Sequence, residues 1–533
     1  MPVKSIIHIS SRCGGGKSYH TITELHNHIL KTKKDSKKPG FFLLASKTNK
    51  LTKQNYDKFH EECQQSKSSI TYKFIDSTTT ASNVMAEISD YMRCNKDGVL
   101  FVSHSAVSRI QPILLKDTTL IFDEVPDNLV KGVRLFHEAR DQGQTWEKFI
   151  SYQTQCNSQV LKVTLNQSTD PNEVIRYINN IQTKKDNVTT ENVAEMLQFL
   201  LDDHEDMYFM SKKKKEVTTN YYMGIDWKIL DELRTYTSSI VILSAELKKT
   251  LLGFVAQKIA GLDIQEQSIT STITLHALHN KKAIIYPILK DKTWSTFIKG
   301  KLAADVLIDQ SLNILQADTV LDHALRKIAT QMSGLDYLLI LNKKDRSKDV
   351  YEKDNIKIIS SSSHGSNNYI EYHHAAYLAS KRPDPIEIIS FNLFASKHNL
   401  IQSELIDSVI TERCHESAYQ CLARTSIRDA NYSLEGPHLF FVPDMEYAEY
   451  VASWFEQGYA TIDTSQSCTV QDTKSKQTKT KKDIGLLTFI LTTNRSIKTP
   501  INVLLKQVKI STATYNRLRA KHKASMQQLG LMK

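Results

Sequence analysis

The sequence has few of the features that mark secreted, membrane or zinc-binding proteins. Seven cysteines are scattered over 533 residues, and no two of them have CxxC spacing. This pattern indicates neither a zinc site nor a disulfide framework. No apolar run approaches the roughly 20 residues that cross a bilayer, and the first ten residues do not resemble a secretory signal. We therefore expect a soluble, cytoplasmic protein with reduced thiols and no membrane partner.

Glycine is also scarce, with 17 in the chain, yet Gly14, Gly15 and Gly16 stand together before Lys17 and Ser18. An apolar run at 6–9 predicts a strand before them, and the spacing from 18 to 30 predicts a helix after them. Strand, glycine loop and helix in this order are typical of a P-loop, whose backbone N–H groups bind phosphate.

The residue types of this loop predict its ligands. Lys17 would reach the β- and γ-phosphates of ATP, and Ser18 would bind Mg²⁺. The helix that follows would add the partial positive charge of its N-terminus. The P-loop pattern G-x-x-x-x-G-K-S has its first glycine where this chain has Ser11, so the entrance of the loop departs from the pattern.

Two carboxylates follow a second buried run, at 119–122. At the end of a strand beside a P-loop, Asp123 would hold Mg²⁺ through water, and Glu124 would orient or deprotonate the water that attacks the γ-phosphate. We therefore predict an ATP hydrolase with ATP and Mg²⁺ as ligands.

The remaining apolar runs predict an α/β fold with two tandem domains. We expect a first domain at 1–255 with a mostly helical insertion at about 127–235, and a second domain at 256–463. A flexible basic linker would occupy 464–482 and a small helical tail 483–533. The other predicted strands lie at 41–45, 99–102, 240–243, 283–286, 337–341, 356–359, 385–389 and 438–442.

With these sites in place, the chain resembles a superfamily 2 helicase (DExH/DEAD-like), with some superfamily 1 character. This resemblance implies that the two tandem domains are RecA-like P-loop domains. It also suggests an enzyme of the kind that phages and mobile elements carry for replication. It covers roughly residues 5–445 without the insertion. The segments that resemble helicase motifs lie at 123–126, 45–51, 102–106, 243–246, 363–368 and 418–428.

The resemblance also implies roles for individual residues. Gln420 and an arginine finger, either Arg424 or Arg428, would complete the catalytic site from the second domain. The order Q-x-x-G-R-x-x-R is not kept, because Ala423 replaces the glycine and Arg428 lies one residue late. Contacts with the nucleic-acid backbone are expected from Lys47, Thr48, Asn49, Ser103, His104, Gly365 and Asn367, which can donate hydrogen bonds.

The tail resembles a helix-turn-helix, with helices expected at 500–508 and 512–523. Arg517 and Arg519 on its second helix would contact duplex DNA. The net charge of +11 favours a polyanionic partner. A small helical domain that only packs on the ATPase or on a partner is the alternative. The run Lys212–Lys215 is expected to be a solvated loop, and a contact with nucleic acid is its less favoured alternative.

We expect a helicase that couples ATP hydrolysis to translocation on single-stranded DNA in replication or repair, with replication proteins as further partners. Three other functions are compatible with the sequence. The protein would be a translocase or remodeller that does not unwind, an ATP-switched origin-binding or defence protein, or a small-molecule P-loop kinase. The second α/β domain, with arginines near its end, disfavours the kinase.

Overall fold

The computed structural model describes thirteen stretches of the chain. These are residues 3–79, 83–138, 145–154, 160–183, 188–214, 217–268, 281–345, 355–361, 369–428, 436–471, 501, 505 and 512–521. Within them, no helix is both long and apolar enough to cross a membrane. The architecture is mixed α/β with parallel sheets.

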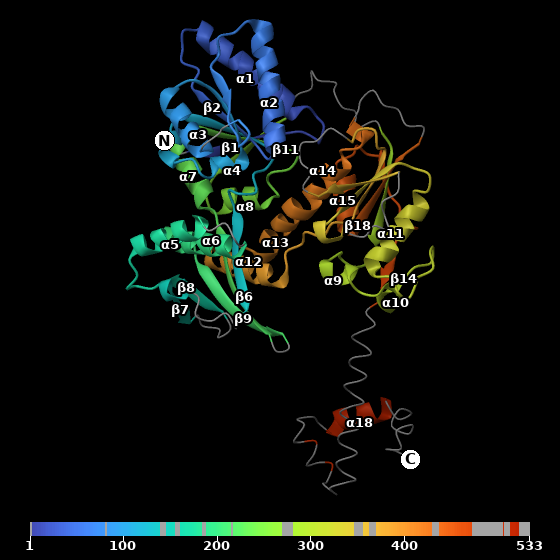
Figure 1. Cartoon of the computed structure of the whole chain (residues 1–533). Helices are drawn as coiled ribbons and strands as arrows, with labels where there is room; N and C mark the ends of the chain where they lie inside the picture. The colour runs from blue at the N-terminus through green and yellow to red at the C-terminus, as the bar shows by residue number, and fades with distance from the viewer. Residues whose placement is uncertain are drawn as a thin grey trace. The chain divides into compact units, whose positions relative to one another are not determined.

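A seven-stranded parallel sheet carries the N-terminal half, in the order β12-β1-β11-β5-β2-β4-β3 (Figure 1). The five strands predicted in this region are confirmed, and β3 and β12 were not predicted. Every residue of β2 is buried, as expected for a parallel strand covered on both faces. The strands are β1 (Ser5–Ser10), β2 (Phe41–Ser46), β3 (Tyr72–Phe74), β4 (Gly98–Ser103), β5 (Thr118–Asp123), β11 (Ser239–Ser244) and β12 (Asp263–Ser268).

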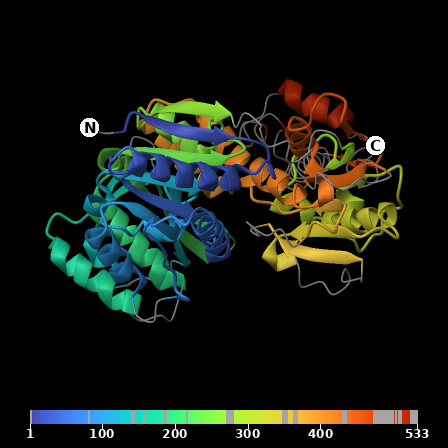
Figure 2. The same ribbon diagram turned by 90° about the horizontal axis from the view of Figure 1, so that it is seen from above.

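The order of this sheet brings distant segments together. Figure 2 shows blue β1 between the two green strands β11 and β12, where Ile6 pairs with both Ile240 and Ile264. The strands β12 and β11 therefore complete a sheet that begins at the N-terminus. Helices cover the sheet: α1 (Lys17–Lys34), α2 (Asn49–Ser66), α3 (Val84–Cys94), α4 (His104–Val107), α7 (Lys228–Tyr236) and α8 (Leu251–Lys258).

The sequence predicted a mostly helical insertion, but the insertion in the structure is not mostly helical. It is a five-stranded sheet in the order β6-β10-β9-β8-β7, with antiparallel neighbours, and helices pack on one of its faces. The prediction rested on the helix formers and polar residues of this stretch, but polar residues such as those of β9 (MYFMSKKK) also suit an antiparallel strand with one face toward water. The elements are β6 (Lys131–Glu138), β7 (Ile150–Thr154), β8 (Leu161–Leu165), α5 (Pro171–Thr183), α6 (Val188–Asp202), β9 (Met207–Lys214) and β10 (Val217–Asp226).

A six-stranded sheet follows, in the order β16-β15-β17-β18-β13-β19. Its predicted strands are confirmed except the one at 385–389, which is wrong. Those residues begin α12, because Asp384 and Glu387 form a capping box around Pro385, a helix start rather than a strand. The strands are β13 (Ala283–Leu289), β15 (Tyr337–Leu341), β16 (Ile356–Ser360), β17 (His374–Tyr377), β18 (His438–Asp444) and β19 (Ala460–Ile462).

One long helical path of this half contains a π-helical turn. It comprises α13 (Gln402–Ile410), the π-helix η6 (Thr411–Glu416) and α14 (Ser417–Leu422), followed by the short η7 (Ser426–Arg428). Short π-helical segments are frequent at functional sites. The other helices here are α12 (Pro385–Lys397) and α15 (Met445–Ala452).

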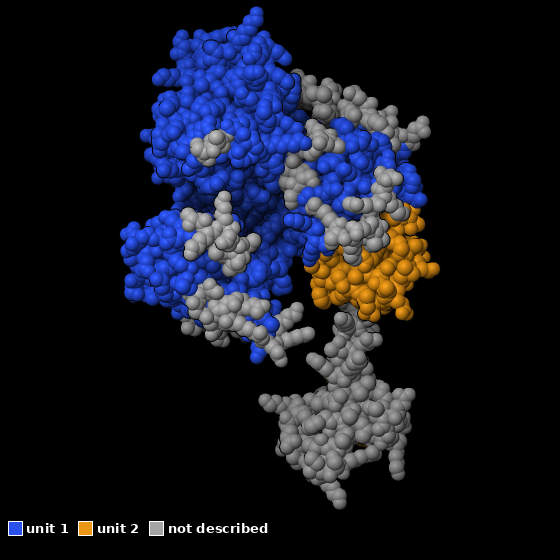
Figure 3. Space-filling model, viewed as in Figure 1, with its two compact units in different colours: residues 1–287, 332–464 blue, residues 288–331, 465–533 orange. Residues whose placement is uncertain are grey.

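The chain divides into two compact units, coloured separately in Figure 3. Unit 1 holds residues 1–287 and 332–464, and unit 2 holds residues 288–331 and 465–533. All three sheets described above lie in unit 1, apart from the last residues of β13. Unit 2 contains α9 (Thr296–Lys299), α10 (Ala303–Val306), β14 (Leu307–Ile308), α11 (Val320–Gln331), β20 (Thr469–Val470) and α18 (Thr512–Lys521).

The first part of the predicted linker is ordered. Strand β20 pairs with β14, and Cys468 is fully buried. Cys468 lies beside Asp309, whose carboxylate accepts hydrogen bonds from His323 and Lys327, each at 2.7 Å. Residues 464–471 are therefore held by packing and polar contacts, and the rest of the predicted linker lies outside the described residues.

This buried cluster has the donor types of a metal site, but its hydrogen bonds indicate a different role. The guanidinium of Arg326 lies 3.0 Å from Nδ1 of His323. Because arginine can only donate, Nδ1 accepts, and the N–H of Nε2 then faces Asp309. That nitrogen is not available to a metal in this arrangement, so we interpret the cluster as a structural hydrogen-bond network.

Candidate nucleotide site

The glycine loop has the backbone of a phosphate cradle. Gly14 and Gly16 have φ of 78° and 71°, which L-residues rarely adopt, and Gly16 immediately precedes α1. The ammonium of Lys17 donates to the carbonyl oxygens of Ser11 and Arg12, at 2.6 and 3.1 Å. Lys17 therefore already lies along the loop, from which a phosphate can recruit it.

The structure explains why a serine is tolerated at the first position of the loop. A Cβ on Gly15 would lie 2.4 Å from the hydroxyl oxygen of Ser11 and 2.9 Å from the carbonyl oxygen of Arg12. The side chain of Ser11 therefore occupies space that is open only because residue 15 is glycine. The departure from the P-loop pattern is thus matched within the loop itself.

Asp123 is anchored at the end of β5 by two donors. Its two carboxylate oxygens accept hydrogen bonds from the hydroxyl of Ser18 and from the amide of Asn55, both at 2.7 Å. Burial raises the pKa of Asp123, and the hydrogen bonds from Asn55 and Ser18 oppose that rise. Ser18 and Asp123 thus stand together as predicted for a Mg²⁺ site, and their oxygens are the donors that Mg²⁺ prefers.

Asn55 was missed by sequence reasoning. It lies in the second turn of α2, is 5% exposed, and also donates to the hydroxyl of Ser46 at 3.0 Å. No motif marks it, because its importance comes only from the packing of α2 beside β5.

Glu124 follows Asp123 with a strained backbone. Its φ is 77°, a left-handed value that is costly for a residue with a side chain, and its N–H donates to the carbonyl of Leu243 at 2.9 Å. The hydrogen bond to β11 holds the turn in place. The side chain of Glu124 lines the same cavity as the glycine loop.

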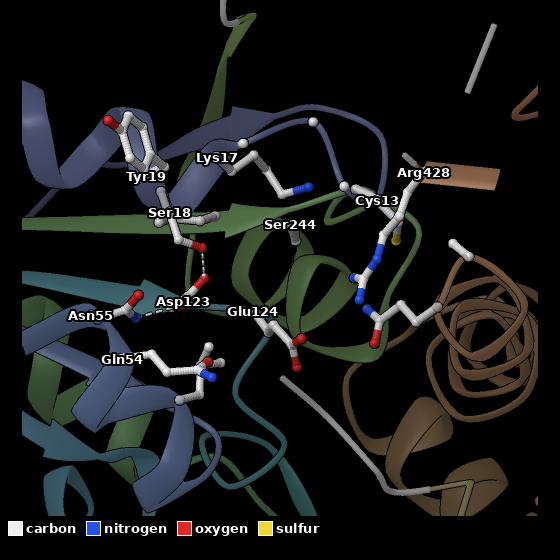
Figure 4. Close-up of a pocket in the computed structure, with 18 of the residues that line it drawn as sticks. Cys13, Lys17, Ser18, Tyr19, Gln54, Asn55, Asp123, Glu124, Ser244 and Arg428 are labelled. Atoms are coloured by element: carbon white, nitrogen blue, oxygen red, sulfur yellow. Dashed lines mark hydrogen bonds between the residues drawn. The ribbon is translucent and has the colours of Figure 1, made fainter. Parts of the chain in front are cut away.

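The second sheet contributes side chains to that cavity from α14 and η7. Gln420, Arg424 and Arg428 line it together with the loop, Asp123 and Glu124, and its volume is about 520 Å³. Figure 4 shows Lys17, Glu124 and Arg428 reaching into one space. The catalytic residues predicted from both halves of the chain are therefore brought together.

The two arginines are held in different ways. Arg424 is 4% exposed, and its Nε and one terminal nitrogen have no hydrogen-bond partner among the described residues. Arg428 packs against the glycine loop, since a Cβ on Gly14 would lie 2.8 Å from its own Cβ. Burial and the neighbouring charge of Arg424 lower the pKa of Arg428. The buried guanidinium of Arg424 and the half-buried one of Arg428 favour an anion beside them.

The loop is also held by Tyr419, which lies in the segment 418–428 that resembles a helicase motif but was not predicted to contact the loop. The N–H of Cys13 donates to its hydroxyl at 3.0 Å, and the Tyr419 ring stacks on Trp454 with centroids 4.9 Å apart. Beside it, Gln420 donates to the carboxylate of Glu416 at 3.3 Å. Burial raises the pKa of Glu416 to about 7.

The residues predicted to contact nucleic acid differ in their surroundings. His104 is 3% exposed and packs edge-on against Phe122, where burial lowers its pKa to about 4. Thr48 caps α2 by accepting from the N–H of Leu51, and Lys47 pairs with Asp127 at 3.4 Å.

These contacts and the other predicted ones stay predictions. Asn49 begins α2 and is partly exposed, and the hydroxyl of Ser103 lies 3.0 Å from that of Ser105. Gly365 and Asn367 lie outside the described residues. Helix α18 (Thr512–Lys521) confirms the second predicted helix of the tail, and Arg517 and Arg519 are exposed on it. Most of the first predicted helix lies outside the described residues.

Comparison with known proteins gives matches only among solved structures. No protein-family model and no curated protein matches the chain. It is similar to a structure of apo XPD (11% identity, TM-score 0.47, covering 86% of this chain and 97% of that one). It is also similar to S. cerevisiae Dbp5 bound to RNA and ADP BeF3 (9%, TM-score 0.34, 86% and 86%) and to the DEAD-box helicase Mss116 bound to single-stranded RNA and UDP-BeF (9%, TM-score 0.32, 95% and 80%). The roles proposed below therefore rest on this chain's own side chains.

Proposed function

We propose that this protein is an ATP-driven nucleic-acid motor, a helicase or translocase whose expected track is single-stranded DNA in replication or repair. The observation that carries the proposal is the composite cavity. Its phosphate-binding loop and its acidic pair come from the first sheet, and two arginines come from the second. A site divided in this way changes when its two halves approach or separate, which is what a motor requires.

The residues have separate roles in this proposal. Lys17 and the backbone of Gly14–Gly16 bind the β- and γ-phosphates, and Ser18 and Asp123 hold Mg²⁺, which neutralises phosphate charge when bound. Glu124 orients the attacking water and accepts its proton. Gln420, positioned by its hydrogen bond to Glu416, completes the wall of the cavity near that water.

Arg424 and Arg428 stabilise the charge that develops on the γ-phosphate. The unpartnered nitrogens of Arg424 support this role, because a phosphate oxygen would satisfy them. Arg424→Ala and Arg428→Ala are each expected to lower kcat by roughly 10³-fold or more, with little change in the affinity for a fluorescent ATP analogue. The variant with the larger loss identifies the arginine finger.

The test of the function is the ATPase rate of wild type and Lys17→Ala with single-stranded DNA, duplex DNA and RNA. We expect hydrolysis that nucleic acid stimulates and that Lys17→Ala abolishes. Normal hydrolysis by Lys17→Ala would refute the assigned site, and a rate that no nucleic acid changes would refute the motor in favour of an ATP switch.

A pair of displacement assays distinguishes the two kinds of motor. A helicase displaces the strand of a partial duplex. A translocase or remodeller displaces a triplex-forming strand and leaves the duplex intact. Both assays use the full chain with ATP, and Lys17→Ala is the control for each.

A further inference from the structure

The insertion carries an exposed aromatic and basic surface that the ATPase site does not use. The outer face of its sheet is the one opposite α5 and α6. At one end of this face α12 covers the sheet, where Ile386 packs against Tyr208 and Met223. Phe136 lies farther along the sheet, in β6, and is 55% exposed. Helix α12 therefore does not cover this end of the sheet.

At this end the ring of Phe136 is exposed, and beside it lie Tyr221 and Met210, which are half-buried and pack against the residues under α12. Phe136 pairs across the sheet with Tyr221, and Tyr221 pairs with Met210. The rings of Phe136 and Tyr221 have centroids 6.5 Å apart. Because the three residues are cross-strand neighbours on one face, they form a continuous platform.

Positive charge borders this platform on two sides. The guanidinium of Arg134 lies over the Phe136 ring, 5.6 Å from its centroid, and is held there by Asp384 at 2.6 Å. This contact orients the ring, which remains 55% exposed and open to contact with another planar group. Lys212 is exposed one pleat beyond Met210 on the same face of β9.

The next lysine, Lys213, is also exposed, but its side chain points to the opposite face of the sheet. Successive side chains of a strand point to opposite faces, and Phe209 of the same strand packs on the side of α6, as Lys213 must. The lysine run that sequence alone suggested to be a solvated loop is thus partly strand, and Lys212 faces the platform whereas Lys213 does not.

We propose that Phe136, Tyr221 and Met210, with Arg134 and Lys212, form a stacking surface for single-stranded nucleic acid. Bases stack on aromatic side chains regardless of sequence, and nearby cations bind the phosphates. The occupant is a polyanion with exposed planar groups, which fits an exposed phenylalanine bordered by cations. The inference rests on the proposed function, because it supplies the motor with a second contact to its track.

Binding of full-length protein to fluorescently labelled oligo(dT) and oligo(U), followed by anisotropy, tests the surface. Phe136→Ala is expected to weaken binding about tenfold, the loss of one stacked base, and Phe136→Trp is expected to restore it. The matched control is Phe297→Ala. Phe297 is 72% exposed beneath the ammonium of Lys301 at 4.2 Å, and its loss should leave binding unchanged.

The charge contribution has its own matched pair. Lys212→Gln is expected to reduce the slope of log K against log salt by about 0.7, the value for one phosphate contact on a single strand. Lys213→Gln, on the other face, is expected to leave the slope unchanged. Equal effects of the two lysine variants would overturn the inference.

The outcomes separate this inference from the proposed function. If Phe136→Ala binds as wild type does while nucleic acid still stimulates Lys17-dependent hydrolysis, the stacking surface is refuted and the motor stands. An equal loss in Phe297→Ala refutes the surface as well. If wild type binds no single strand and is not stimulated, the motor itself is refuted along with the surface.

Discussion

Asn55 offers a sharp test of the nucleotide site, because it acts on Asp123 without entering the chemistry. Its amide donates to one carboxylate oxygen of Asp123 at 2.7 Å, and the hydroxyl of Ser18 donates to the other. Burial raises the pKa of Asp123, and these two bonds oppose the rise. Asn55→Ala removes one of them, so we expect the pKa to rise further.

The size of the effect follows from the type of bond. A hydrogen bond to a charged acceptor contributes about 1.5–3 kcal/mol, and one pKa unit corresponds to about 1.4 kcal/mol. Asn55→Ala should therefore raise the pKa of Asp123 further, because one of the two bonds that stabilise its ionised form is lost. Since Mg²⁺ binds the ionised carboxylate and competes with the proton, the Mg²⁺ concentration for half-maximal ATPase should rise roughly 10-fold or more, and most at low pH.

The measurement is a Mg²⁺ titration of ATPase activity at two pH values, near 6 and near 8, with saturating ATP. Gln65→Ala is the control, because Gln65 is exposed in the last turn of the same helix, ten residues beyond Asn55. The reasoning fails if Asn55→Ala and wild type need the same Mg²⁺ concentration at both pH values while both remain folded.

Two further predictions concern the glycine loop and the insertion. Gly14→Ala should lower kcat/KM about tenfold or more, since its Cβ would meet Arg428. Gly334→Ala has the same φ of 78° but nothing within 4 Å, and should leave kcat/KM unchanged; equal losses would refute the contact. Glu205→Gln should lower the free energy of unfolding by roughly 2 kcal/mol in urea titrations, because it breaks a largely buried pair with Lys397. Although burial raises the pKa of Glu205, hydrogen bonds including that from Lys397 bring it below its ordinary value. The wild-type advantage is therefore present at neutral pH and is lost as the pH falls through that lowered pKa; an advantage that persists at acid pH would contradict this.

Much of the fold is readable from continuous apolar runs. The runs at 41–45, 99–102 and 337–341 became central strands, because a parallel strand buried on both faces needs no polar alternation. The run at 385–389 is also rich in β-branched apolar residues, with three isoleucines, yet it begins a helix. Its capping box and N-terminal proline outweigh the strand propensity of its isoleucines, so local start signals should be weighed before composition.

Strands without a continuous apolar run were harder to predict. Strand β12 has the sequence DIQEQS, which is polar because it lies at the edge of its sheet. Strand β17, with the sequence HAAY, is short and built from small residues, although it is central. Neither carries the periodic apolar signal on which single-sequence reasoning depends, and their positions follow only from long-range pairing.

The candidate site was predictable where one residue type has one task. Lys17, Ser18, Asp123 and Glu124 need no tertiary information, because a P-loop and an acidic strand end recur at characteristic positions. Asn55 could not be found in this way, since amides in helices have many uses. The burial of His104 could not be foreseen for the same reason, because a histidine that resembles a motif residue is equally suited to a buried packing position.

The departure from the P-loop pattern is explained by the contacts around the loop when they are considered together. Ser11 stands where the pattern has glycine, and its side chain fits against Gly15. The residue after the next, Cys13, is fixed by the hydroxyl of Tyr419, and Gly14 is in contact with Arg428. Tyr419 and Arg428, which belong to the half of the chain with the second sheet, therefore help to fix the conformation of the loop in place of its first glycine. A loop held in this way cannot rearrange independently of α14 and η7, so phosphate binding and the position of the arginines are coupled through backbone contacts as well as through charge. That coupling is the property that a divided ATPase site needs if hydrolysis is to move one half against the other.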